Sequence, residues 1–129
     1  MCKSVLKLAL TSLALVSLLA SGGISAKELG WQSANAVVTI DQLPEQGRST
    51  YQRIYQGGPF LHEKDGVVFG NRERLLPAHK RGYYREYTVI TPGSKDRGAR
   101  RIVCGGASTN PDACFYTADH YASFRKIVP

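Results

Sequence analysis

Residues 83–104, which read YYREYTVITPGSKDRGARRIVC, carry the pattern of two strands joined by a turn. The first part, 83–90, is rich in aromatic and β-branched residues, which favour strands. Thr91-Pro92-Gly93-Ser94 is a typical turn sequence, and 99–104 is the expected returning strand. We therefore expect an antiparallel hairpin whose centre lies near Gly93 and Ser94.

A helix is expected before this hairpin, because Leu43, Ile54 and Tyr55 recur near helical spacing. Asp41 suits the N-cap region of that helix, and Gly57-Gly58-Pro59 ends it. Residues 37–40 are either an edge strand or an extended lead-in, and 105–112 are expected to form a loop. Further short strands are expected at 66–69, 115–117 and 123–128. The sequence thus predicts an α+β fold, with one N-terminal helix packed on a small antiparallel β-sheet.

The N-terminal segment has the order of features that is typical of a secretory signal peptide. Lys3 and Lys7 precede an apolar run at 8–20, and small residues follow it as far as Ala26. The run is shorter than the roughly 20 apolar residues that span a bilayer, so a membrane anchor is the weaker alternative. We expect a signal peptide at 1–26, a single domain at 27–129, secretion, and no membrane attachment after cleavage.

Charge and cysteine content narrow the class of protein further. The formal charge is +7 over 129 residues, and removing the two signal lysines leaves about +5. This excess suggests an acidic partner, such as nucleic acid or an anionic surface. Without Cys2, the pair Cys104 and Cys114 remains, an even number that suits an oxidising compartment. The sequence contains no cluster with zinc-ligand spacing, so we expect neither a structural metal nor a cofactor.

The expected hairpin also gathers charged side chains on one face. With the turn centred near Gly93, Glu86 would pair with Arg101 and Ile90 with Arg97. Because side chains alternate along strands, Glu86, Arg97 and Arg101 would share a face, unless the register slips by one residue. Exposed cross-strand salt bridges would explain the same pattern. The crowding of arginine on one short strand favours phosphate binding instead, since a guanidinium can grip phosphate with two donors.

The histidines give a weaker signal. His120 lies between two expected strands, so we expect it at the end of a loop. A single histidine is more often a surface or packing residue than a catalyst. His62 and His79 lie in polar stretches without a partner pattern of carboxylates or arginines, and no role is assigned to them.

Several longer motifs follow one another from residue 65 onward. They are 65–69 (DGVVF), 71–73 (NRE), 82–89 (GYYREYTV), 91–93 (TPG), 97–105 (RGARRIVCG) and 116–121 (YTADHY). In this order and spacing they resemble the guanyl-specific bacterial ribonucleases, the family of barnase and ribonuclease Sa, and they are more similar to the latter. The resemblance covers nearly the whole of 27–129.

The resemblance implies a catalytic set of four residues and a reaction without a metal ion. Glu86 matches the general base that takes the proton of the ribose 2′-hydroxyl, and His120 matches the general acid that protonates the leaving 5′-oxygen. Arg97 and Arg101 match the arginines that hold the phosphate, and Tyr121 matches a tyrosine beside it. The implied reaction is cleavage of single-stranded RNA after guanosine, through a 2′,3′-cyclic phosphate that is then hydrolysed to a 3′-phosphate.

The resemblance also implies a guanine pocket in the stretch Phe69, Gly70, Asn71, Arg72 and Glu73. The base would lie against Phe69, and backbone amides near Asn71 and Arg72 would meet its oxygen. Glu73 would accept hydrogen bonds from the N1 and N2 donors, which makes it a specificity residue. Gly70 stands where ribonuclease Sa carries Gln, and the missing side chain at the pocket rim would soften the preference for guanine.

One further departure from the family concerns the cysteines. The bridge that joins the two chain ends in ribonuclease Sa has no counterpart here, because Cys104 matches an internal position and Cys114 lies in a longer loop. A bridge between Cys104 and Cys114 is our hypothesis.

Two other classes of function remain as alternatives. A non-catalytic, basic RNA-binding module would explain the charge and the arginines, although not a glutamate among them, where it would repel phosphate. A secreted toxin would keep the same chemistry, and a purely structural interaction domain is the weakest reading. The expected partners are RNA and a small acidic inhibitor protein resembling barstar, and the protein is expected to be a monomer.

Overall fold

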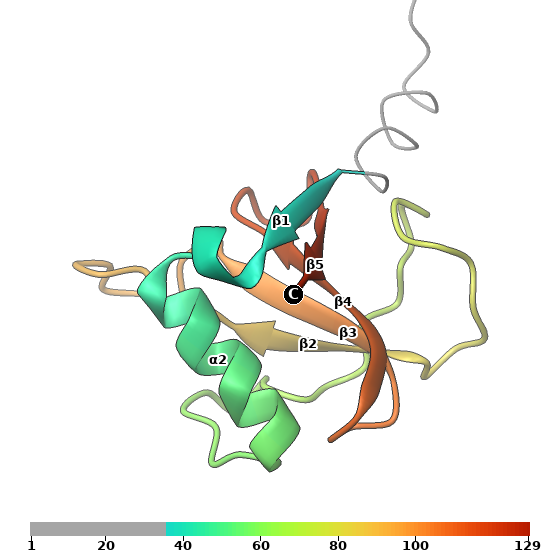
Figure 1. Ribbon diagram of the computed structural model, residues 1–129, viewed down its shortest axis with the longest axis horizontal. Helices are drawn as coiled ribbons and strands as arrows, with labels where there is room; N and C mark the ends of the chain where they lie inside the picture. Colours follow the sequence, from blue (N-terminus) through green and yellow to red (C-terminus); the bar gives the residue numbers. More distant parts are fainter. Residues whose placement is uncertain (1–35) are drawn as a thin grey trace, which may run out of the picture.

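The computed structural model describes residues 36–129, so the signal peptide expected at 1–26 lies outside the described residues. Figure 1 shows one helix beside a strongly twisted sheet. In chain order the elements are β1 (Val37–Thr39), a 3-10 turn (Ile40–Gln42), α2 (Glu45–Gln56), β2 (Tyr84–Thr88), β3 (Arg101–Gly106), β4 (Pro111–Thr117) and β5 (Arg125–Val128).

The strands of the described part form one sheet in the order β1-β5-β4-β3-β2. Neighbours from β2 to β5 are antiparallel, whereas β1 pairs with β5 in the parallel direction. The expected α+β class is therefore confirmed, but the sheet is mixed and not wholly antiparallel. A parallel pair needs a long connection. Here almost the whole domain separates the two strands, so no local signal could indicate the pairing.

The expected helix is present but begins later than its N-cap signal suggested. Asp41 lies in the 3-10 turn, and α2 starts at Glu45 behind Pro44. Leu43, with ψ 147°, is extended, as the residue before a proline usually is. Gly57 ends the helix at φ 77°, a left-handed conformation that glycine adopts without strain.

The register of the central hairpin differs from the expected one by two residues. Glu86 pairs with Val103, and Arg101 pairs with Thr88. The first strand, β2, is shorter than expected, β3 is displaced by two residues toward the C-terminus, and Arg97 lies in the connection between them. The expected pairs of Glu86 with Arg101 and of Ile90 with Arg97 are therefore wrong. A shift of two residues leaves each side chain on its original face, so Glu86 and Arg101 still share one.

Other expected elements also change in extent. The stretch 66–69 makes only an isolated bridge between Val68 and Arg85, although it runs beside β2 and donates from the Phe69 amide to the Tyr84 carbonyl (2.9 Å). The expected loop at 105–112 is narrower, because β3 and β4 both extend into it, and β5 starts at Arg125. Within 37–40, Val37–Thr39 form the strand β1 at the sheet edge, and Ile40 begins the 3-10 turn.

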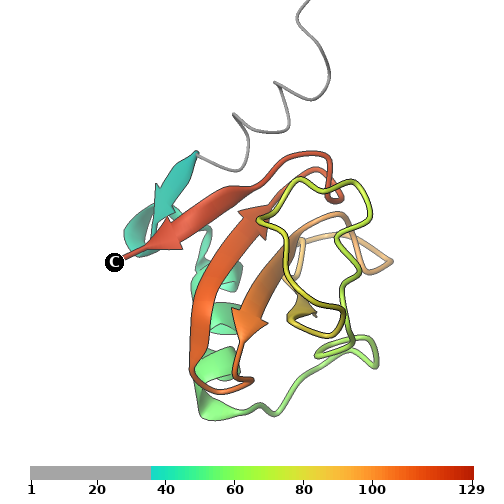
Figure 2. The ribbon, with the colours of Figure 1, turned by 90° about the vertical axis from the view of Figure 1, so that its right-hand side faces the viewer.

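The two faces of the sheet are covered differently. In Figure 2 α2 lies behind the sheet, and the long segment before β2 lies in front of it. The helix side holds the larger apolar cluster, which includes Leu43, Ile54, Ile102 and the Cys104–Cys114 disulfide. The hypothesis of that bridge is confirmed, and the two cysteines are direct cross-strand partners. The opposite face holds a second cluster and the charged residues described next.

Candidate active site

A row of polar side chains crosses three strands on the face opposite α2. Glu86 and Thr88 belong to β2, Arg101 pairs with Thr88 from β3, and Thr117 pairs with Arg101 from β4. Because facing residues in adjacent strands put their side chains on the same side, these groups form one polar strip. This strip is the foundation of the candidate site.

The carboxylate of Glu86 is held from two directions. Arg97 Nη2 donates to Glu86 Oε1 at 3.1 Å, and the Tyr121 hydroxyl donates to Oε2 at 2.5 Å. The Glu86 side chain is only 12% exposed. Both carboxylate oxygens are therefore oriented, which positions the group as an acceptor of a proton from a bound molecule.

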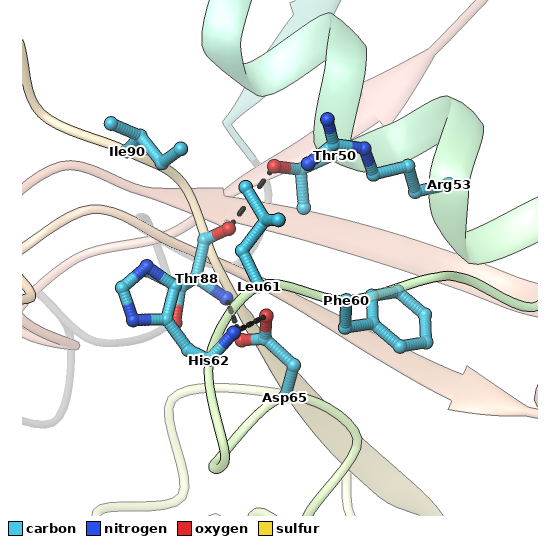
Figure 3. Close-up of a pocket in the computed structure, with 8 residues that line it drawn as sticks. All are labelled: Thr50, Arg53, Phe60, Leu61, His62, Asp65, Thr88 and Ile90. Carbon is cyan, nitrogen blue, oxygen red and sulfur yellow. Dashed lines mark hydrogen bonds between the residues drawn. The ribbon is translucent and has the colours of Figure 1, made fainter.

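Arg97 is itself fixed by the residues on its other side. Its Nε donates to Thr88 Oγ1 at 2.6 Å, and Nη2 lies 3.9 Å from Asp65 Oδ1. The Asp65 side chain is only 5% exposed and accepts from the amides of Thr88 (2.7 Å) and His62 (3.2 Å), as Figure 3 shows. A loop residue 32 positions from Arg97 thus sets the position of the guanidinium. Asp65 was not among the residues predicted for the site, although it opens the DGVVF motif.

Arg101 is a buried guanidinium with spare donors. Its residue is 3% exposed, and Nη1 donates to the carbonyls of Arg100 (2.8 Å) and Arg97 (3.5 Å). Nε is buried without a hydrogen-bond partner in the structure. A buried cation is costly unless it is paired, and within residues 36–129 no carboxylate forms an ion pair with Arg101. The arrangement suits an incoming anion such as phosphate.

Tyr121 joins the charged strip to the aromatic residues. Its ring stacks on Phe69, with ring centres 5.0 Å apart and planes at 26°, and Arg101 lies 5.9 Å from its ring centre. Burial, together with the hydrogen bond to Glu86, raises the pKa of Tyr121 to about 12. The phenol therefore stays protonated at neutral pH and remains a hydrogen-bond donor.

His120 is exposed at the tip of the turn that follows β4. His120 and Tyr121 both have left-handed backbones, at φ 53° and 68°, which is uncommon for two successive residues that are not glycine. The His120 amide donates to the Ala99 carbonyl (3.0 Å), and its ring centre lies 5.0 Å from that of Tyr121. The structure thus places His120 beside Tyr121, at the end of a loop as expected.

Asp119 holds the turn in this shape. It accepts hydrogen bonds from the Thr117 hydroxyl and from the amide and hydroxyl of Ser123. Burial alone would raise the pKa of Asp119, but these hydrogen bonds outweigh it and hold the pKa below its ordinary value. Asp119 therefore stays ionised and keeps the strained turn closed.

The stretch expected to hold guanine forms a tight loop beside Phe69. The Asn71 side chain is used within the loop, because it donates to the Leu76 carbonyl (3.0 Å) and accepts from the Leu76 amide (3.1 Å). Asn71 has φ 48°, while Arg72 and Glu73 are exposed. At Gly70 an added Cβ would come no closer than 3.4 Å to Arg72, so steric fit does not require glycine there.

The structure therefore brings five of the expected site residues into one connected network: Glu86, Arg97, Arg101, Tyr121 and Phe69. His120 adjoins this network through Tyr121, and 70–73 follow directly after Phe69. A shallow pocket between α2 and β2 lies behind Asp65 and not over Glu86; it is drawn in Figure 3. Among the described residues there is no group of three or more potential metal ligands. No helix within 36–129 has the length and hydropathy to span a membrane.

Comparisons with known proteins identify relatives of this chain. A family described as ribonuclease matches residues 27–128. Guanyl-specific ribonuclease Sa3 of Kitasatospora aureofaciens is 58% identical over 90 residues, which are 70% of this chain and 62% of the relative. The match thus spans less than two thirds of Sa3. Guanyl-specific ribonuclease Sa of the same organism is 50% identical over 93 residues, which are 72% of this chain and 94% of the relative.

A solved structure of ribonuclease Sa2, in complexes with mononucleotides, is similar in fold. It has a TM-score of 0.69 and 47% sequence identity, and the match covers 74% of this chain and 96% of that one. The family match covers most of the chain, and the identities to Sa and Sa2 extend over almost their full lengths. The chain therefore belongs to the ribonuclease family.

Proposed function

We propose that this protein is a guanyl-specific endoribonuclease that cleaves single-stranded RNA through a 2′,3′-cyclic phosphate. The relatives Sa and Sa3 are named guanyl-specific ribonucleases, and ribonuclease Sa2 has been solved with guanosine-2′-cyclophosphate. The observation that carries the proposal is the Glu86 carboxylate, held by Arg97 and Tyr121 next to the buried Arg101. A base and an anion site side by side are what internal attack on a phosphodiester requires.

In the first step, Glu86 accepts the proton of the ribose 2′-hydroxyl. The 2′-oxygen then forms a bond to phosphorus, and the bond from phosphorus to the 5′-oxygen of the next nucleotide breaks. His120 gives its proton to that leaving oxygen, which leaves a 2′,3′-cyclic phosphate. In the second step His120 takes a proton from water, whose oxygen forms a bond to phosphorus. The bond from phosphorus to the 2′-oxygen breaks, Glu86 returns its proton to that oxygen, and a 3′-phosphate results. DNA lacks the nucleophile and is not cleaved.

Arg97, Arg101 and Tyr121 stabilise the negative charge on the phosphoryl oxygens. Negative charge builds on these oxygens in the transition state, where fixed cations and donors lower the barrier most. The unpaired Nε of Arg101 supplies such a donor. The protonated Tyr121 hydroxyl, which donates to Glu86 in the free protein, supplies a second one after Glu86 has accepted the substrate proton. Because acid, base and charge stabilisation come from side chains, this reaction proceeds without a metal ion or cofactor.

The preference for guanine is assigned to 69–73. The base lies against Phe69, which the stack with Tyr121 holds in place. Backbone amides of the loop closed by Asn71 meet the guanine oxygen, and Glu73 accepts from N1 and N2. Gly70 leaves the pocket rim open and softens the preference, so cleavage after other bases is slower but not absent.

Export and partners complete the proposal. Residues 1–26 act as a signal peptide that is removed, and the monomeric domain 27–129 is secreted; the Cys104–Cys114 bridge suits an oxidising destination. RNA binds by charge, so binding weakens as salt rises. A small acidic inhibitor protein resembling barstar protects the producing cell.

The test is digestion of a short, defined RNA in excess EDTA, with the fragment ends measured by mass. Fragments that end in guanosine 2′,3′-cyclic phosphate are the expected result. Cyclic ends that form equally fast after every base would keep the catalytic set but contradict the guanine pocket. RNA that binds and stays intact would overturn the enzyme in favour of a basic RNA-binding module.

A further inference from the structure

The segment 74–82, which follows the guanine loop, is strongly basic and has no part in the reaction described above. It contains three basic side chains, Arg74, Lys80 and Arg81, and no acidic one. Lys80 and Arg81 are exposed, as are Arg72 and Arg74. Because the segment crosses the sheet face opposite α2, this charge lies on the same side of the molecule as the active site (Figure 2).

An aromatic pair lies at the end of this basic segment. The rings of His79 and Tyr83 stack with their centres 3.7 Å apart and their planes at 13°, and Tyr84 meets His79 edge-on at 5.8 Å. The Tyr83 hydroxyl donates to Asp112 Oδ2 at 3.0 Å, and this hydrogen bond holds the Tyr83 ring in place. His79 itself is exposed. The stack is a rigid, flat surface with basic neighbours at Lys80 and Arg81.

The position of Tyr83 relates this surface to the active site. A Cβ added at Gly105 would lie 2.1 Å from the Tyr83 ring, so the ring lies directly on the β3 backbone at that glycine. Gly105, Val103 and Arg101 alternate onto the same face of β3. Four residues of strand cover about 13 Å, so the stack and the proposed phosphate site lie about that far apart along the same face of β3. Phe69, Tyr83 and Tyr121 all pack on the same apolar cluster between them.

We propose that His79 and Tyr83, with Lys80 and Arg81, form a second RNA subsite that binds a nucleotide outside the reacting pair. A base stacks on the His79 ring, and the adjoining phosphates meet Lys80 and Arg81. Successive bases of single-stranded RNA bind in this way to aromatic rings in a basic groove, with little dependence on sequence. The proposal rests on the proposed ribonuclease function and adds to it a preference for longer substrates.

The acidic groups near this surface do not oppose the subsite strongly. Asp112 accepts a hydrogen bond from the Tyr83 hydroxyl. Glu73 lies in sequence between the exposed Arg72 and Arg74, so the local net charge stays positive. A purely structural role for His79, as a cover for Tyr83, would affect all substrates alike. Substrate length therefore separates the two roles.

The experiment compares two substrates with the purified protein. One is the dinucleoside phosphate GpC, which fills only the reacting pair, and the other is a single-stranded 12-mer RNA with one central guanosine. We expect His79→Ala to lower kcat/KM on the 12-mer about fivefold to tenfold, the lower part of the range for one stacked base, and to leave GpC unchanged. His79→Phe, which keeps an aromatic ring, should restore most of the 12-mer rate.

The basic residues are tested through salt. Lys80→Ala/Arg81→Ala should reduce the slope of log kcat/KM against log salt on the 12-mer by about 1.4, since each phosphate contact to single-stranded RNA contributes about 0.7. Arg53→Ala, which removes a positive charge from α2 on the other side of the sheet, is the matched control and should leave the slope as it is.

The outcomes separate this subsite from the ribonuclease function. An unchanged 12-mer rate, or an equal fall on both substrates, for His79→Ala would overturn the subsite. A parent protein that cleaves neither substrate would instead overturn the proposed function.

Discussion

The two faces of the sheet are built by the same strands and differ in almost every other respect. Toward α2, Ile102 and Cys104 enter a closed apolar cluster with the disulfide in it. On the opposite face, Glu86 and Arg101 meet polar partners and an aromatic surface. Arg101 and Ile102 are adjacent and are 3% and 0% exposed, yet one lies beside backbone carbonyls and a ring and the other among hydrocarbon.

From this difference we infer that the face toward α2 mainly stabilises the fold, whereas the opposite face carries the proposed catalytic residues. Burial of apolar surface beneath α2 favours folding, whereas burial of Arg101 costs desolvation free energy that its few hydrogen bonds only partly offset. Such a cost is expected where a side chain must receive an anion. The comparison therefore predicts that substitutions on the helix side change the free energy of unfolding and substitutions on the other side change the rate.

The largest effect is expected at Glu86. Glu86→Gln keeps one acceptor oxygen for Arg97 but removes the proposed base, so kcat/KM on a guanosine-containing RNA should fall about 10²–10⁴-fold. The midpoint of thermal unfolding should change little, because the amide oxygen can still accept from Arg97 and the amide NH2 can donate to the Tyr121 hydroxyl oxygen. A variant that keeps more than a tenth of the parent kcat/KM would show that Glu86 is not the base.

The opposite result is expected one residue from Arg101. Ile102→Ala should lower the free energy of unfolding by about 2–5 kcal/mol, as measured by urea denaturation, because it leaves a cavity beneath α2. Ile102→Val should lower it by only about 0.5–1.5 kcal/mol. This milder variant should fold even if Ile102→Ala does not. Both variants should keep their kcat/KM at temperatures where they are folded. A loss of rate in folded Ile102→Val would break the division between the faces.

Asp65 gives a finer test of the comparison, because we expect it to affect the reaction through Arg97 and not by contact with RNA. Asp65→Asn keeps an oxygen for the Thr88 amide but removes the charge 3.9 Å from the guanidinium. We expect kcat to fall about tenfold, about 1.4 kcal/mol in the barrier, with KM little changed, as for a residue that positions another. Lys64→Ala, an exposed neighbour in the same loop, is the control. Equal losses in the two variants would argue against a positioning role.

The smallest effect concerns the ionisation of Tyr121. Its pKa is raised to about 12 by burial and by Glu86, against 10.0 for an ordinary tyrosine. The protonated form favours the folded state, so this stabilisation is complete below pH 10 and is lost between pH 10 and about 12. Tyr121→Phe should remove one late-titrating phenol from the absorbance titration and flatten the alkaline fall in stability. If Tyr121→Phe instead removed a phenol that titrates near pH 10, the raised pKa of the Tyr121 hydroxyl would be wrong.

Part of the fold and most of the site residues could be predicted before the structure. The period of two along 83–90 placed Glu86 on the polar face, and Gly57 marked the helix end, because both signals are local. The register failed by two residues because the connection between β2 and β3 is longer and less regular than a tight turn. Asp65 was missed for a similar reason, since its contacts to Thr88 and Arg97 lie far along the chain.

The sequence by itself determined which residues alternate, where the helix ends, which cysteines are available to bridge and which motifs mark a ribonuclease. Only the tertiary structure decided the parallel pairing of β1 with β5, the anchoring of Arg97 by Asp65 and the His79–Tyr83 stack. The physical reason is the range of the interactions. Backbone geometry and side-chain period act over a few residues and can be read locally, whereas pairing and packing join residues that only the folded chain brings together.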